Sequence, residues 1–128
     1  MLKVCCLLVA SFVSVSALAD EVGDLRDMAK LSEEYRDLSI YCLVEMKVKK
    51  INGWASDSCE EYKKFSKNDL QKYKNEMKNT TSSFVAYSKS KDVSVRRVKR
   101  GLKQLLIIQS NMDSMDKINK QIKVASNT

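Results

Sequence analysis

Apolar residues recur every three to four positions along most of the chain after Gly23, which is the spacing of one face of an α-helix. The first such stretch covers about residues 24–51, and its apolar surface is wider than one stripe, so we expect a helix central to a bundle. Asn52 and Gly53 are expected to end this helix, because both tolerate the left-handed conformation found at helix C-termini. The predicted stripe consists of Met28, Leu31, Tyr35, Leu38 and Cys42, with Ile40, Leu43, Val44, Met46 and Val48 beside it.

Two shorter signals follow the first helix. Overlapping capping-box patterns at Asp57–Glu60 and Ser58–Glu61 predict a short second helix that begins near residue 58. A further start signal at Ser66 predicts a third helix over about 67–88, which is either separate from the second helix or continuous with it.

A final helix is predicted after a polar connector at 88–92, with Asp92 or Ser94 as its cap and an end near Ile122. Gly101 lies inside it and costs about 1 kcal/mol relative to alanine, which allows a bend there. The whole pattern predicts one all-α domain, a small bundle of three long helices and one short helix. The stripe expected to face the core is Val95, Val98, Leu102, Leu105, Ile108, Met112 and Met115.

The first nineteen residues have the features of a secretory signal peptide. Lys3 supplies a positive start, residues 4–15 are mostly apolar, and residues 16–19 (SALA) end in the small-x-small pattern of a cleavage site. The apolar run is shorter than the roughly 20 residues that a membrane span needs, although a retained anchor is the alternative. We therefore expect residues 1–19 to be removed and residues 20–128 to form a single periplasmic or secreted domain.

The segment after the expected cleavage site keeps two cysteines, Cys42 and Cys59. An even pair in an exported chain predicts one disulfide, with two free thiols as the alternative. The bond would close a loop of about 18 residues, stabilise the fold by about 3 kcal/mol and join the first two helices as a hairpin.

The composition gives little support to a catalytic or a metal-binding function. The 128 residues include no His and no Pro, and His is the usual general base and metal ligand. Two cysteines without an imidazole form neither a usual zinc site nor an activated nucleophile. We therefore expect no cofactor and no catalytic residues, and we rank an enzyme behind two kinds of binding protein.

Charge is distributed unevenly along the chain. Residues 20–62 contain 11 acidic and 6 basic residues, a net charge of −5, whereas residues 63–128 contain 5 acidic and 16 basic residues, a net charge of +11. Part of this difference is expected to be balanced between helices of the bundle. The remaining positive charge is densest at Arg96, Arg97, Lys99, Arg100 and Lys103.

The basic residues at 96, 99, 100 and 103 share one side of the last helix, which is expected to lie opposite its apolar stripe. They are either a solvated helix face or a site for an acidic protein partner. Nucleic acid is not an expected partner, because the chain is exported and no aromatic residues are interleaved with the basic ones. Contact with a membrane surface is a weaker reading, since the apolar stripe is expected in the core.

Trp54 stands apart from these patterns because it lies in the connector after Gly53. It either plugs the end of the helical hairpin or anchors a partner, since tryptophan is enriched at binding hot spots. The plug is the favoured interpretation.

Residues 34–42 read EYRDLSIYC and resemble the start of the periplasmic immunity proteins that act against type VI secretion amidase toxins. In that family a similar segment precedes a cysteine on the first helix of a small disulfide-bonded helical domain, but the partner cysteine lies much farther along than Cys59. The resemblance covers nine residues and implies a class only, that of small exported helical proteins that hold or block another protein. We therefore expect an inhibitor or immunity-type protein; an envelope accessory or chaperone-like component of a secretion or conjugation system is the alternative, and the oligomeric state is left open.

Overall fold

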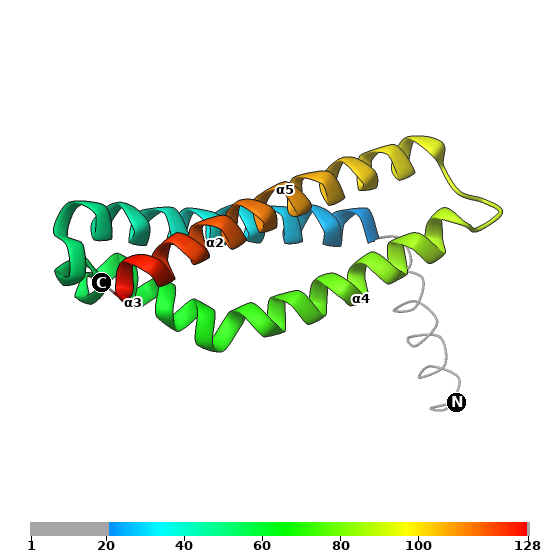
Figure 1. Ribbon diagram of the computed structural model, residues 1–128. Coiled ribbons are helices and arrows are strands. Elements are labelled where there is room, and N and C mark those ends of the chain that lie inside the picture. The colour runs from blue at the N-terminus through cyan, green and yellow to red at the C-terminus, as the bar shows by residue number, and fades with distance from the viewer. Residues whose placement is uncertain (1–20, 128) are drawn as a thin grey trace, which may run out of the picture.

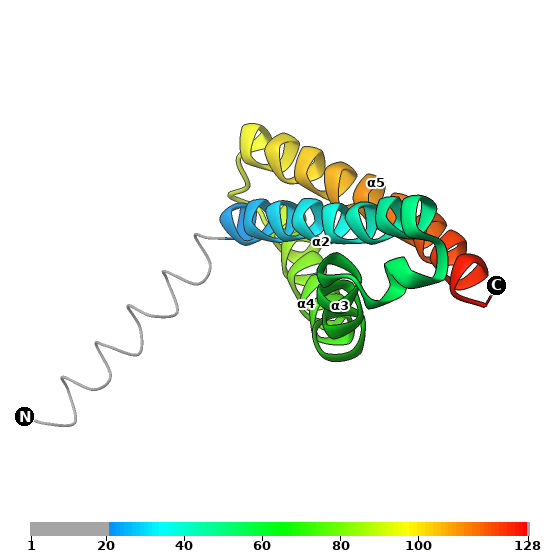
Figure 2. The same cartoon turned by 90° about the vertical axis from the view of Figure 1, so that its left-hand side faces the viewer.

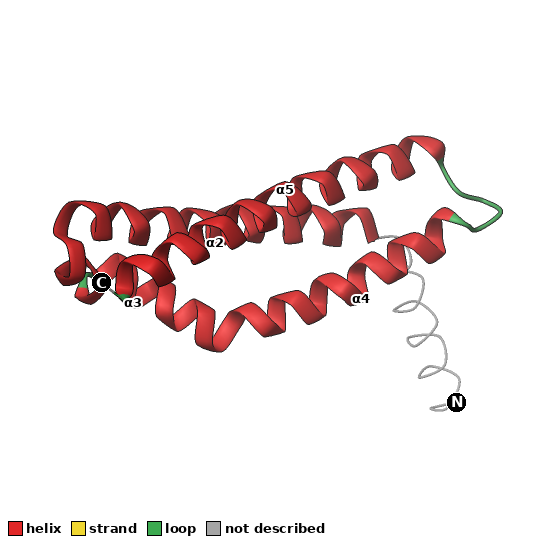
Figure 3. Cartoon of the chain, viewed as in Figure 1, coloured by secondary structure: helices red, strands yellow, loops and turns green. Residues whose placement is uncertain are grey.

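The computed structural model describes residues 21–127, so the signal peptide expected at 1–19 lies outside the described residues. Helices account for nearly all of the described chain, and no strand occurs between residues 21 and 127 (Figure 3). The predicted all-α fold of three long helices and one short helix is confirmed. The elements are α2 (Glu21–Lys49), the 3₁₀ helix η1 (Lys50–Ala55), α3 (Asp57–Lys64), the π-helical turn η2 (Phe65–Asp69), α4 (Leu70–Ser88) and α5 (Val95–Ser126).

Helix α2 is central, as its wide apolar surface predicts, because it packs against both α4 and α5. Helices α2 and α5 lie side by side and run in the same direction (Figures 1 and 2). In the sequence between them, α3 and α4 carry the chain back in the opposite direction. The start of α5 therefore lies beside the start of α2, and the end of α5 lies beside the disulfide-linked end of α2.

The interior has two apolar clusters with a polar layer between them. One cluster surrounds Leu25 and Phe84, and the other surrounds the two cysteines. In the layer, the Asn111 amide donates a hydrogen bond to the Ser32 hydroxyl (2.9 Å) and accepts one from the Arg36 guanidinium (2.8 Å). Because buried polar groups need their partners, this network favours one register of α5 along α2.

The disulfide between Cys42 and Cys59 is confirmed, with the two Cα atoms 4.4 Å apart. It joins α2 to the first turn of α3. That turn begins earlier than predicted, at Asp57, because the Ser56 hydroxyl accepts a hydrogen bond from the Cys59 backbone N–H (3.3 Å) and caps the helix.

The second and third predicted helices are continuous through η2, one of the two arrangements left open by the sequence. In this π turn the buried Phe65 ring stacks on the Tyr35 ring of α2, with ring centroids 4.0 Å apart. Tyr35 also meets Tyr73 of α4 edge-on at 5.3 Å. The chain thus changes from α3 to α4 without leaving the surface of α2.

The end of α2 differs from the sequence-based expectation. The left-handed residue is Lys50, with φ of 53°, and no glycine in the described chain has a positive φ. Gly53 instead lies within η1, pressed against the α2 backbone: an added Cβ would lie 2.6 Å from the Glu45 carbonyl carbon and 2.8 Å from the Met46 Cα. Its role is therefore close backbone approach rather than a left-handed turn.

The core-facing stripe of α5 is also partly different. Positions 101, 108, 115 and 122 are all buried, and this seven-residue spacing defines the side that faces α2. Val95 and Leu102 were predicted to lie on that stripe, but their exposed fractions are 67% and 50%. The same spacing that buries Gly101 turns its neighbour Leu102 outward. The helix continues without a break through Gly101 and ends at Ser126, beyond the predicted end.

Candidate functional site

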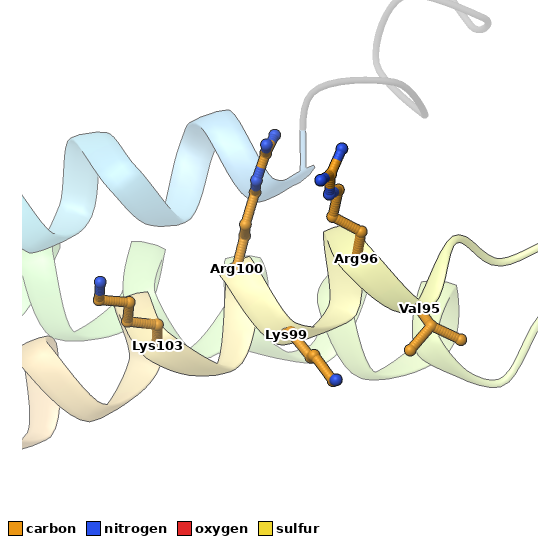
Figure 4. A pocket seen from close by; sticks show the side chains of 5 residues that line it. All are labelled: Val95, Arg96, Lys99, Arg100 and Lys103. Carbon is orange, nitrogen blue, oxygen red and sulfur yellow. The ribbon is translucent and has the colours of Figure 1, made fainter.

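The candidate site lies on the first three turns of α5. Ser94 caps the helix by accepting a hydrogen bond from the Arg97 backbone N–H (3.4 Å), so Ser94 rather than Asp92 fills the predicted role. No acidic residue occurs between Val93 and Met112. The cations that line a shallow pocket here, together with Val95, are Arg96, Lys99, Arg100 and Lys103, and we call these four residues the basic face (Figure 4).

The basic face covers a wide arc of the helix. Arg96, Arg100 and Lys103 extend to one side of α5, whereas Lys99 extends to the other side with Val95 (Figure 4). All four basic side chains belong to exposed residues. The four positions line one shallow pocket, as expected of positions on one side of the helix, although the Lys99 side chain extends away from the other three.

No salt bridge or hydrogen bond within residues 21–127 engages any side chain of the basic face. The four ion pairs in this part of the chain each join residues within α2 or within α3. The charge difference between the acidic and the basic helices is therefore not balanced by direct salt bridges between helices in this part of the chain. Four exposed positive charges on one short helical segment are left for solvent or a partner.

Arg97 is the one basic residue of the predicted cluster that the fold uses itself. Its guanidinium carbon lies 5.7 Å from the centroid of the Tyr87 ring at the end of α4. Burial raises the pKa of Glu21 at the start of α2, and the nearby positive charge of Arg97 partly opposes that rise. Arg97 is therefore a contact between helices, and it does not belong to the basic face.

Exposed aliphatic side chains accompany the basic face. Val95, Leu102 and Leu106 have exposed fractions of 67%, 50% and 67%. Together with Lys99 they follow a four-three-four spacing, which places them in one stripe along the outside of α5. Sequence reasoning missed this stripe because it assigned Val95 and Leu102 to the core; the seven-residue spacing from Gly101 to Ile122 is the signal that separates the two faces.

Trp54 lies far from the basic face, since η1 and the start of α5 are at opposite ends of the bundle (Figure 1). The indole is half-buried against the disulfide cluster, with its ring centroid 6.3 Å from that of Tyr62. The Lys63 ammonium lies 4.2 Å from the indole centroid and donates a hydrogen bond to the Trp54 carbonyl (2.6 Å). These contacts support the plug interpretation, and the fold does not bring Trp54 together with the other candidate residues.

The fluorescence of Trp54 tests this placement. Native protein is expected to emit at shorter wavelength than unfolded protein, because the indole is partly removed from water by Tyr62 and the disulfide cluster. Emission spectra with and without denaturant measure the shift, and they report on residue 54 alone because the chain has one tryptophan. A native spectrum as red as that of the unfolded chain would contradict the plug.

No family model, curated protein or solved structure matches the chain. In the described helices, no segment is long and apolar enough to cross a membrane. Within residues 21–127 there is also no group of three or more His, Cys, Asp or Glu side chains that could hold a metal ion.

Proposed function

We propose that the protein is an exported binding protein, of the inhibitor or immunity type, that holds an acidic surface of another protein with the basic face of α5. One observation carries this proposal: four exposed cations without partners in the described chain lie beside the exposed aliphatic stripe of Val95, Leu102 and Leu106. A helix that is merely solvated explains the cations but does not explain the aliphatic residues among them.

The two parts of this surface would contribute differently to binding. The cations would steer an acidic partner toward α5 and raise the rate of association. The aliphatic side chains would supply apolar area, at about 25 cal/mol for each Å² removed from water. Both contributions fit a protein partner better than a small charged ligand, because the aliphatic stripe extends along three turns of helix.

Export is supported by two independent features. The buried Cys42–Cys59 bond is of the kind that forms and persists in oxidising compartments. The signal-like pattern of residues 1–19 agrees with such a location. The likeness of residues 34–42 to periplasmic immunity proteins supports the inhibitor or immunity class within this proposal.

The experiment compares two variants that carry the same number of charge reversals. In the test variant, all four residues of the basic face are replaced by Glu. In the control variant, four exposed lysines of η2 and α4 are replaced by Glu, so both proteins lose the same net charge. The control positions are Lys67, Lys72, Lys74 and Lys78.

Wild type and the control variant are expected to capture the same partner from envelope extract, and the test variant is expected to lose it. Both variants should remain folded, because exposed charges usually change stability by about 0.5 kcal/mol or less each. Capture by the wild type should also weaken as salt rises, since the Debye length is about 8 Å at physiological ionic strength. Equal recovery of the partner by the test variant and the wild type would remove the basic face from the mechanism.

A further inference from the structure

A second exposed apolar stripe lies on the outside of α2, toward its C-terminal end. Tyr41, Val44 and Val48 have exposed fractions of 59%, 51% and 74%. Their three-four spacing places them in one row, and the intervening Cys42 and Met46 are buried on the opposite side of the helix. The row therefore lies on the solvent-facing side of α2, opposite the side that packs into the core.

The charges on either side of this row have opposite sign. Residues 33–37, on its N-terminal side, contain three acidic residues and one Arg, a net charge of −2. Residues 45–50, which overlap the row at Val48 and extend past its C-terminal end, contain three lysines and one Glu, a net charge of +2. Toward the C-terminal end of α2, the surface is therefore first acidic, then apolar and then basic.

We propose that a second copy of this chain docks on the α2 row, with the two α2 helices antiparallel about a twofold axis between Tyr41 and Val44. In that arrangement Tyr41 of each copy lies opposite Val44 of the other, and the acidic residues 33–37 of each copy face residues 48–52 of the second copy, which include two of the three lysines. A twofold interface uses the same patch on both subunits, so a patch must be complementary to itself after rotation. The acidic–apolar–basic order along α2 meets this condition.

The other arrangements of two copies lack this complementarity. Parallel α2 helices would set acidic flank against acidic flank and lysine flank against lysine flank. Pairing through α5 would set one basic face against another, because α5 has no acidic residue before Asp113. Like charges placed across an interface oppose association. This inference does not depend on the proposed function, since it uses a different helix and the opposite end of the bundle (Figure 1).

The oligomeric state of residues 20–128 tests the proposal first. Sedimentation velocity over a range of concentrations should show a monomer–dimer equilibrium for the wild type. Val44→Asp should abolish the dimer, because it places a carboxylate against the Tyr41 ring of the second copy, next to the twofold axis. Leu102→Asp, an equivalent change on the exposed stripe of α5, should leave the dimer intact. A wild type that is monomeric at every concentration, or a Val44→Asp protein that still dimerises, would overturn the proposal.

Charge-swapped variants then test the antiparallel geometry. Glu33→Lys with Glu34→Lys makes both flanks net +2, and Lys47→Glu with Lys50→Glu makes both flanks net −2, counted over the same two segments. Each variant alone should be monomeric at low salt, and an equimolar mixture should form a heterodimer. Circular dichroism would verify that each variant is folded. Failure of the mixture to associate, or self-association of either variant as strong as that of the wild type, would contradict the antiparallel pairing.

Discussion

Replacing Gly101 with alanine is expected to destabilise the protein by about 1–3 kcal/mol, although alanine is the better helix former by about 1 kcal/mol. The added Cβ would lie 3.0 Å from Cδ2 of the Phe84 ring and still closer to its Cε2 and Cζ atoms. Phe84 is only 2% exposed and belongs to the cluster around Leu25, so the ring has little room to move. Denaturant unfolding of the two proteins measures the difference.

A double-mutant cycle separates this steric effect from helix propensity. Phe84→Leu removes the ring atoms that the added Cβ would overlap, so Gly101→Ala should cost less in the Phe84→Leu background than in the wild type. The two residues are in direct contact, and contacting residues are expected to show such non-additivity. Helix propensity alone predicts that Gly101→Ala stabilises the wild type. That result would contradict the close packing of α5 on Phe84.

Removing the disulfide is expected to lower the free energy of unfolding by about 2–4 kcal/mol. The appropriate variant replaces both Cys42 and Cys59 with alanine, because a single replacement leaves a reactive thiol. Both cysteines are fully buried in a cluster with Met46, Tyr62 and Ile122, so loss of packing adds to the loss of the cross-link. Denaturant unfolding measures the change.

Wild-type protein in a strong reductant serves as the matched control for this variant. It loses the cross-link but keeps both sulfur atoms in place, so its unfolding free energy should fall between those of the oxidised wild type and the alanine variant. An unchanged denaturation midpoint for the reduced wild type would show that the bond contributes nothing to the stability of the native protein.

Much of the fold follows from local properties of the sequence. The three-to-four spacing of apolar residues depends on helix geometry alone, and it correctly predicts the long helices and the central place of α2. The disulfide is equally accessible, because it rests on the parity of the cysteines in residues 20–128 and on the helical hairpin between them. These features need no knowledge of which helix faces which.

The orientation of α5 is different, because apolar residues lie on both sides of that helix. Sequence reasoning treated Gly101 as a weakness of the helix, whereas the fold uses its missing side chain to seat the Phe84 ring. A core position that is occupied by glycine is not detected by a search for apolar side chains. Leu102 was consequently placed inside, and the aliphatic half of the candidate site was missed.

The basic half of the candidate site was predictable, since the density of Arg and Lys on one segment is a property of the sequence itself. The exception is Arg97, whose neighbours Tyr87 and Glu21 come from other helices and meet it only in the folded chain. Gly53 is a similar case, because its close contact with the backbone of α2 depends on how η1 folds back.

The π turn η2 also sets the rotation of α4 about its own axis relative to α3. Each residue of an α-helix advances the side-chain direction by about 100°, so deleting one residue from Phe65–Asp69 would rotate α4 by that angle relative to α3. Cys59 is tied to α2 by its covalent bond, and the Tyr73 hydroxyl donates a hydrogen bond to the Met28 carbonyl (2.8 Å). A shortened turn could satisfy one of these attachments but not both. Changes of length should therefore be tolerated in the 89–94 connector and rejected at η2, although both are short segments between helices.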